Sequence, residues 1–368
     1  MEPLQFDNTK DQLIWKDLSK QVNAYFDASK CTRFAGKSSY LKAILLLLAY
    51  LSAIGLIYYG AAFELPMLFF TMYLLAGILK TTLVLNIAHD AAHACFFQSK
   101  RLNAIAVRVM DFLGASSYIW KLRHVHSHHP YPNVPGWDLD ISQSKLIRLN
   151  EQNPYRRVYR FQHLYMPFIY LFYTLFWLLL RDWKDWKLEH IGNKAIGQFA
   201  WKEFFISLFF KIVYVGYFIL IPIICFHVPP LTVLAGFLLL HFAASAVTAL
   251  ALVSTHVGEF SVYPEPDANG RFQHSWFRHQ LLTTFDFAPQ NPWVTAFFGG
   301  FNLHLVHHLF PGVAHEHYPA LTRILRGVLA DYGLEYQYYP SLPAAVKSHF
   351  RHLKQQSVHP AEIFSHML

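Results

Sequence analysis

The chain has 368 residues, of which 54% are hydrophobic and only 15% are charged. Soluble globular chains carry roughly a quarter of charged residues, so this composition argues against soluble domains and for a membrane protein. The formal net charge is +8, but Lys and Arg lie scattered at the ends of apolar runs, so we attribute it to anionic lipid and expect no nucleic-acid partner.

The N-terminal region, residues 1–42, is polar and contains no secretory signal. Residues 11–26 have apolar side chains at helical spacing, so we expect a cytoplasmic amphipathic region. Two apolar runs follow, at 43–62 and about 65–85, each close to the roughly 20 residues that a helix needs to cross the hydrocarbon core. They predict a first transmembrane hairpin.

Further spans are expected at 204–226 and 231–253, and the few residues between them make a second hairpin. Residues 101–120 have the pattern of an interfacial helix. We therefore divide the chain into the N-terminal region 1–42, a membrane domain 43–320 with the histidine clusters, and a cytoplasmic C-terminal tail, 321–368.

Residues 164–180 are ambiguous, because they are apolar but short and contain Pro167. The histidines on both sides of the second hairpin must meet on one side of the membrane, so the chain between them crosses an even number of times. The hairpin supplies both crossings, and we expect 164–180 to lie in the interface or to be re-entrant. Lys and Arg crowd the histidine side and are absent from the short outer loops, which places the histidines in the cytoplasm.

Histidines form three short clusters, and imidazole is the commonest metal ligand in proteins. The clusters are His89 with His93; His124 with His126, His128 and His129; and His304 with His307 and His308, while His256 stands alone after the last apolar run. On an α-helix, side chains at i and i+4 share a face, so His89 and His93 can hold one ion, and the pair 124/128 repeats that spacing. The adjacent pairs 128/129 and 307/308 diverge by about 100° and could serve two ions.

Two other interpretations of the clusters, a zinc-protease site and a metal transporter or sensor, fit less well than a site for two metal ions. The first pair resembles the zinc-protease motif H-E-x-x-H, but Asp90 stands where the Glu is needed, and a catalytic zinc uses only three protein ligands. A membrane metal transporter or sensor is a remote alternative, because the histidines follow the spans and, apart from His241, do not lie within them. Eight or nine imidazoles suit two metal ions. We expect His126 to point away from the site and His241 to be a packed, neutral, hydrogen-bonded side chain.

Longer motifs around these histidines resemble those of the membrane fatty acid desaturases, especially bacterial acyl-CoA and acyl-lipid members. The segment His128-His-Pro-Tyr-Pro-Asn-Val-Pro-Gly-Trp-Asp-Leu-Asp140 is similar to the family's H-H-x-x-T-N-x-x-G-x-D-x-D, with Pro132 at the usual Thr. Residues 299–311 resemble G-G-L-N-x-[QH]-x-x-H-H-L-F-P, and 315–319 resemble H-x-H-Y-P. The segment 255–259 is similar to A-H-x-x-E, which makes His256 a ligand. Residues 276–280 resemble the family's W-x-x-H-Q, to which we assign no role.

The resemblance implies an all-α integral membrane protein with two transmembrane helical hairpins, interfacial helices and a cytoplasmic, histidine-rich di-iron cap. Asp138, Asp140 and Glu259 are either hydrogen-bond partners of ligand rings or ordinary solvated loop carboxylates. The implied iron ligands and catalytic residues are His89, His93, His124, His128, His129, His256, His304, His307 and His308.

The implied reaction introduces a carbon–carbon double bond into a fatty acyl chain, with dioxygen as co-substrate and two electrons. Oxidising an unactivated methylene needs a redox metal, and zinc has no redox chemistry, which leaves iron or copper among the metals that imidazole binds; the family resemblance implies two irons. The substrate is an acyl-CoA, an acyl-lipid or an acyl carrier protein thioester. A hydroxylase or ketolase on the same scaffold is the alternative.

The electron supply and the cellular site follow from the same resemblance. Family members with their own haem domain carry His-Pro-Gly-Gly, whereas His-Pro occurs here at 129–130 and 359–360 without the glycines. We therefore expect no built-in haem and an external donor such as ferredoxin or cytochrome b5. We expect a multi-pass protein of the bacterial inner membrane with its active site facing the cytoplasm. Much of the chain resembles front-end desaturases, but His304 stands where those enzymes usually have Gln.

Overall fold

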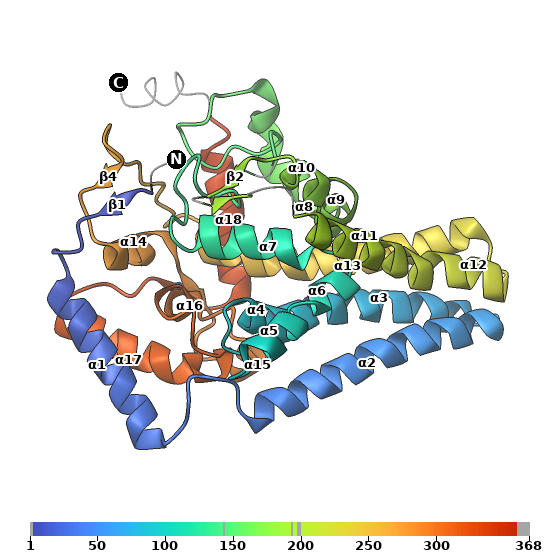
Figure 1. Cartoon of the computed structure of the whole chain (residues 1–368). Coiled ribbons are helices and arrows are strands. Elements are labelled where there is room, and N and C mark those ends of the chain that lie inside the picture. Colours follow the sequence, from blue (N-terminus) through green and yellow to red (C-terminus); the bar gives the residue numbers. More distant parts are fainter. Residues whose placement is uncertain (1–2, 143, 193, 197–199, 359–368) are drawn as a thin grey trace.

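The computed structural model describes residues 3–142, 144–192, 194–196 and 200–358. Within them, four long apolar helical stretches of 26 or 27 residues lie side by side as two hairpins (Figure 1). The first hairpin pairs α2 (Lys37–Ala62) with α3 (Pro66–Leu83), which continues through η1 (Val84–Ala88) into α4 (His89–Ala92). The second pairs α11 (Trp201–Val215), η5 (Gly216–Leu220) and α12 (Ile221–Phe226) with α13 (Pro230–His256). The predicted all-α membrane fold with two hairpins is confirmed.

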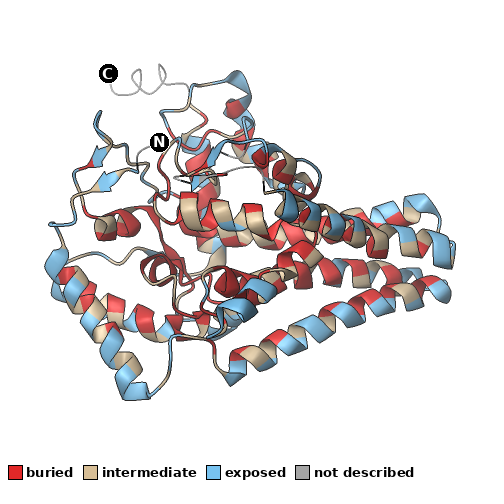
Figure 2. Ribbon diagram, in the orientation of Figure 1, coloured by how far each residue is buried: buried red, intermediate tan, exposed pale blue. Residues whose placement is uncertain are grey.

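The helices turn and pack for identifiable reasons. Pro66 and Pro230 stand in the first turns of their helices, where a missing N–H costs nothing. Gly77 on α3 lies against α13, where a Cβ would collide with the backbone oxygen of Leu240. Small residues allow such close approach between membrane helices. The outward faces are apolar and exposed (Figure 2), as lipid contact requires.

The ambiguous segment 164–180 is a broken helix. After η3 (Arg157–Phe161), α8 (Gln162–Tyr170) meets α9 (Tyr173–Phe176), η4 (Trp177–Arg181) and α10 (Asp182–Asp185) at a bend of 74°. By length and composition this bent pair is either a broken span or a re-entrant loop. The even number of crossings therefore stays a prediction.

The predicted interfacial helix at 101–120 is wrong in its continuity. The chain forms α5 (Lys100–Ala106), α6 (Val109–Phe112) and α7 (Ser117–Arg123). Gly114 takes a positive φ of 84° after α6, a conformation that glycine adopts without steric cost. The side chain of Ser116 then accepts a hydrogen bond from the backbone of Ile119 and starts α7.

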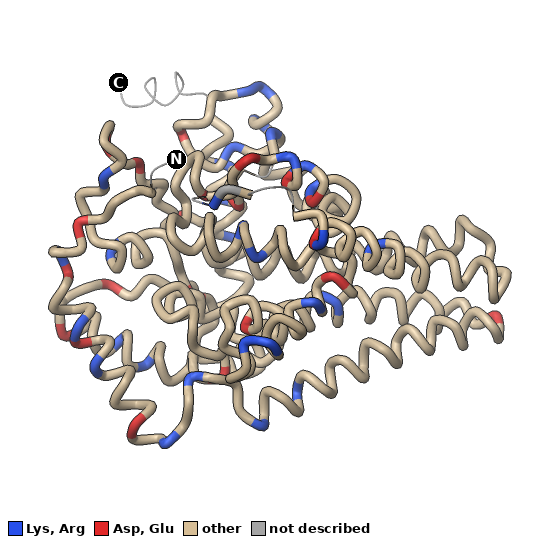
Figure 3. Tube along the Cα trace, in the orientation of Figure 1, with Lys and Arg blue, Asp and Glu red and all other residues tan. Residues whose placement is uncertain are grey.

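The remaining elements form a body at the end of the hairpins where most charged residues gather (Figure 3). The N-terminal helix packs its buried residues Ile14, Leu18 and Val22 against α17, and α18 packs against α13. The division at 1–42, 43–320 and 321–368 stays a prediction, and its last ten residues lie outside the described part. The elements are α1 (Gln12–Ser29), η2 (His124–His128), α14 (Trp276–Thr283), α15 (Pro292–Phe297), α16 (His304–Leu309), η6 (His315–His317), α17 (Tyr318–Asp331) and α18 (Leu342–Gln355), with the strand pairs β1 (Gln5–Phe6) and β4 (Arg271–Phe272), β2 (His190–Ile191) and β3 (Lys194–Ala195), and β5 (Asp286–Phe287) and β6 (Tyr338–Tyr339).

Topology mapping tests the number of crossings. We expect reporters fused after residue 190 and after residue 368 to lie in the cytoplasm, because Lys and Arg concentrate on that side. A cysteine introduced by His227→Cys, in a variant without the natural cysteines, should be labelled from outside the cell. Opposite locations for the two reporters would show that 164–180 spans the membrane.

Candidate metal centre

The three histidine clusters and His256 converge where the spans end. His89 opens α4 at the end of one span, and His256 is the last residue of α13. They fall into two groups of four, and within each group the candidate ligand atoms lie within 4.8 Å of one another. The first group is His89, His93, His124 and His307; the second is His128, His256, His304 and His308. Two groups of this kind can hold two metal ions.

Local helix geometry explains most of this division. His89 and His93 fall in one group, as their α-helical spacing predicts. On α16, His304 and His308 share a group at i and i+4, while the neighbouring His307 points into the other group. The divergence expected for the pair 307/308 is therefore present.

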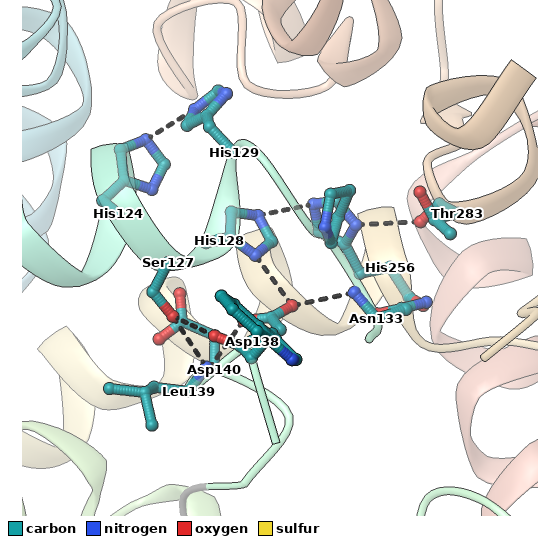
Figure 4. Close-up of polar contacts among 12 residues, drawn as sticks. His124, Ser127, His128, His129, Asn133, Asp138, Leu139, Asp140, His256 and Thr283 are labelled. Carbon is teal, nitrogen blue, oxygen red and sulfur yellow. Dashed lines mark hydrogen bonds and ion pairs between the residues drawn. The ribbon is translucent and has the colours of Figure 1, made fainter. Parts of the chain in front are cut away.

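The second cluster differs from its predicted geometry, because η2 is a π-helix rather than an α-helix. The backbone N–H of His129 donates to the carbonyl of His124 at 3.0 Å, which is the i to i−5 bond of a π-turn. The wider turn places the Nε2 atoms of His124 and His129 3.1 Å apart and sends His128 to the other group (Figure 4). His124 and His128 fall in different groups of four, but they also form a third possible metal-binding group with Asp140, in which the ligand atoms lie within 4.8 Å of one another, so their predicted sharing of one ion stays open. His129 lies beside the first group without belonging to it.

The inward nitrogens fit metal ions. The Nε2 atoms of His93, His307 and His308 are buried and have no hydrogen-bond partner in the described part of the chain. The Nε2 atoms of His128 and His256 face each other at 3.1 Å. The Nδ1 atom of each of these two rings contacts an oxygen and so carries the hydrogen, which leaves two lone pairs facing each other. A shared cation resolves that repulsion.

Protein oxygens hold the outward Nδ1 nitrogens. In four rings the Nδ1–H donates to a fixed acceptor, which sets the tautomer and turns the Nε2 lone pair inward, whereas the Nδ1 atoms of His129 and His304 have no hydrogen-bond partner among the described residues. Asp138 acts as predicted, whereas Asp140 pairs with Arg123 at 2.8 Å and Glu259 lies 3.6 Å from Arg351. The contacts are His128 to Asp138 Oδ2 at 3.0 Å, His256 to the Thr283 carbonyl at 2.9 Å, His307 to the Tyr318 hydroxyl at 2.9 Å and His308 to Gln280 Oε1 at 3.0 Å.

Three of these partners, Thr283, Gln280 and Tyr318, escaped the sequence analysis. Gln280 belongs to the W-x-x-H-Q segment to which we could assign no role, and Tyr318 belongs to the H-x-H-Y-P segment. Both segments signalled their importance only through the resemblance. Asp90 was also missed: its carboxylate accepts hydrogen bonds from the backbone N–H and the Nδ1–H of His315, at 3.0 and 2.7 Å.

Burial keeps most of these imidazoles neutral, which is the form that binds metal. Burial, followed by repulsion from neighbouring imidazoles, holds the pKa well below its usual value in His93, His124, His129, His304, His307 and His308. In His128 burial also opposes the charge, but the charge and hydrogen bond of Asp138 outweigh it and raise the pKa.

His126 and His241 stay out of both groups, as predicted. His126 is half-buried and belongs to neither group. His241 is buried between α9 and α11, with Nδ1 2.8 Å from the hydroxyl of Thr174 and Nε2 3.1 Å from that of Tyr214.

Comparison with known proteins gives one family. Residues 64–340 match the family described as fatty acid desaturase. The chain is 30% identical over 342 residues to a protein of Synechocystis sp. named sn-1 linoleoyl-lipid 6-desaturase, covering 92% of this chain and 93% of the relative. An Arthrospira platensis protein of the same name is 30% identical over 94% of this chain and 93% of its own. An acyl-lipid (8-3)-desaturase of Physcomitrium patens is 27% identical over 96% of this chain and 73% of its own.

Metal analysis of purified variants tests the two groups. We expect two metal ions per wild-type chain, and about one per chain in His307→Ala and in His308→Ala, because each removes a ligand of a different group. His126→Ala is the matched control and should keep both ions. A single metal in the wild-type protein, or loss of a metal from the control, would contradict the assignment.

Proposed function

The chain belongs to the fatty acid desaturase family, and from this we propose that it forms a double bond near the carboxyl end of acyl chains carried by membrane lipids. It is an oxidoreductase, and the hydroxylase or ketolase alternative is not favoured, because the relatives carry desaturase names. The observation that carries the proposal is the pair of buried four-histidine groups at the ends of the spans. Each lies where an acyl chain can arrive from the membrane.

We propose iron in both groups. Two irons would supply the one-electron oxidising power that side chains lack, with dioxygen as the acceptor. The ligands would be the two groups of four histidines together with His129, whose Nε2 lies beside that of His124. In the overall reaction the acyl chain loses two hydrogens, and dioxygen with two electrons and two protons becomes two waters.

The protein's own part is to bind, orient and exclude water. The Nδ1 contacts fix the orientation of four rings, and burial of all the group members except His93 keeps bulk water away from them. An acyl chain held beside these rings reacts at the carbon that its binding places there, which is catalysis by positioning.

The proposed carrier and bond position follow the relatives. Two relatives are named sn-1 linoleoyl-lipid 6-desaturase, and we take the 6 as a position near the carboxyl end of a lipid-bound chain. His304 replaces the Gln that front-end enzymes usually have, yet it is buried in the second group with three other histidines. This supports a metal-ligand role for His304.

Expression in a host without its own desaturases tests the reaction. We expect new double bonds on the carboxyl side of existing ones when diunsaturated chains are supplied, located by mass spectrometry of the lipids. His307→Ala should abolish them, because it removes a ligand. Hydroxy acids without new alkenes would refute desaturation, and new bonds only on the methyl side would refute the front-end position.

We also propose an external electron donor, such as ferredoxin or cytochrome b5, that meets the histidine side in the cytoplasm of a bacterial cell. The formal charge of +8 favours an acidic partner.

Electron transfer should therefore depend on salt. We expect the oxidation of a reduced acidic donor, measured by stopped flow, to slow several-fold between about 0.05 and 0.5 M salt. Added salt shortens the Debye length and so screens the attraction between donor and enzyme. A small neutral reductant serves as control and should show no such change. Equal rates for the acidic donor at both salt concentrations would count against charge-guided docking.

A further inference from the structure

A cavity of about 350 Å³ lies outside the metal centre, between the start of α2, the approach to α15, and η6. Its wall includes Lys42 on α2, Gln290 and Asn291 before α15, and His315 and Glu316 on η6. These segments are far apart in sequence but lie side by side at the cytoplasmic ends of the hairpins (Figure 1). The cavity therefore joins a membrane span to the histidine-bearing body.

The cavity holds an unused positive charge. Lys42 is half-buried and makes no hydrogen bond or ion pair among the described residues. The carboxylate of Glu316 is occupied elsewhere, because it accepts hydrogen bonds from the backbone N–H of Gly36 at 2.9 Å and from the hydroxyl of Ser39. It thereby caps the start of α2, where a negative charge is favourable. The charge of Asp90 acts on Lys42 from a distance, but no described residue forms a hydrogen bond or ion pair with the ammonium, which can therefore contact an anion in the cavity.

Amide groups stand beside that ammonium. The Oδ1 of Asn291 accepts from the backbone N–H groups of Trp293 and Val294, at 3.0 and 3.2 Å. Its Nδ2 is consequently available as a donor. The amide of Gln290 lines the same cavity. A cation with neighbouring N–H donors is the chemistry that binds a phosphate.

The surroundings place the cavity at the level of lipid headgroups. Trp293 on α15 is 82% exposed, and Leu41 and Leu45 on α2 are 59% and 57% exposed. Trp is enriched at the membrane–water interface, while leucines on a span face the acyl chains. A lysine at a span end usually extends to water, whereas Lys42 is held in the cavity wall.

The cavity is also close to the first histidine group. His315 lines the cavity, and its Nδ1 lies 2.7 Å from Asp90 Oδ2. Asp90 directly follows His89, a member of the first histidine group, in α4. A double bond near the carboxyl end requires the headgroup of the lipid to lie near the metals. We infer that this cavity binds the phosphate of the glycerophospholipid whose acyl chain is desaturated, an inference that rests on the proposed function.

The test compares Lys42→Gln with Lys37→Gln, an exposed lysine on the same helix that does not line the cavity. Each protein is reconstituted in nanodiscs with phosphatidylglycerol or diacylglycerol carrying the same acyl chains. We expect Lys42→Gln to raise the phosphatidylglycerol fraction needed for half-maximal rate by about tenfold, the loss of one charge-assisted contact. The Lys37→Gln control should keep the wild-type preference for phospholipid over diacylglycerol.

A second measurement separates this inference from the proposed reaction. Native mass spectrometry should detect fewer bound phosphatidylglycerol molecules on Lys42→Gln than on Lys37→Gln, whether or not turnover occurs. Equal binding and equal preference in both variants, or equal slowing on both lipids, would overturn the inference. Inhibition of the enzyme by inorganic phosphate, while Lys42→Gln keeps the wild-type preference for phosphatidylglycerol over diacylglycerol, would also overturn it. A wild-type protein that makes no product from any lipid would instead refute the proposed function.

Discussion

The structure depends on keeping a set of buried imidazoles neutral and aimed at one another. A buried polar atom without a partner is costly, so each ring needs an acceptor for its outward N–H and a cation for its inward lone pair. The outward acceptors come from distant segments, including Asp138, Thr283, Gln280 and Tyr318. The body at the ends of the hairpins thus supplies the acceptors that orient the ligand rings.

The packing of the membrane helices determines how far apart the two histidine groups lie. His89 and His256 stand at the ends of two spans and belong to different groups. Those spans approach closely because Gly77 lies against the backbone of Leu240. Each group therefore takes one histidine from a packed pair of spans and the others from the segments outside the spans. Close packing between α3 and α13 becomes a constraint on the distance between the two groups.

The parts that the sequence predicted depend on local patterns, and the parts it missed depend on tertiary contacts. Span lengths follow from apolar runs, and the placement of His89 and His93 in one histidine group follows from their helical spacing. The π-turn that pairs His124 with His129 inserts an extra residue that no local pattern marks. The carbonyl of Thr283 is a partner that any residue type could supply, so only the fold reveals it.

One short segment, 315–318, links regions that a division by sequence treats separately. His315 holds Asp90 beside the first cluster, Glu316 caps the start of α2, and Tyr318 orients His307 of the third cluster. The same segment forms a wall of the cavity that contains Lys42. A shift of this segment would move the start of the first span and two ligand-bearing clusters together. The cavity that contains Lys42 and the candidate metal centre are therefore supported by the same contacts, so the proposed headgroup site and the ligands are positioned jointly.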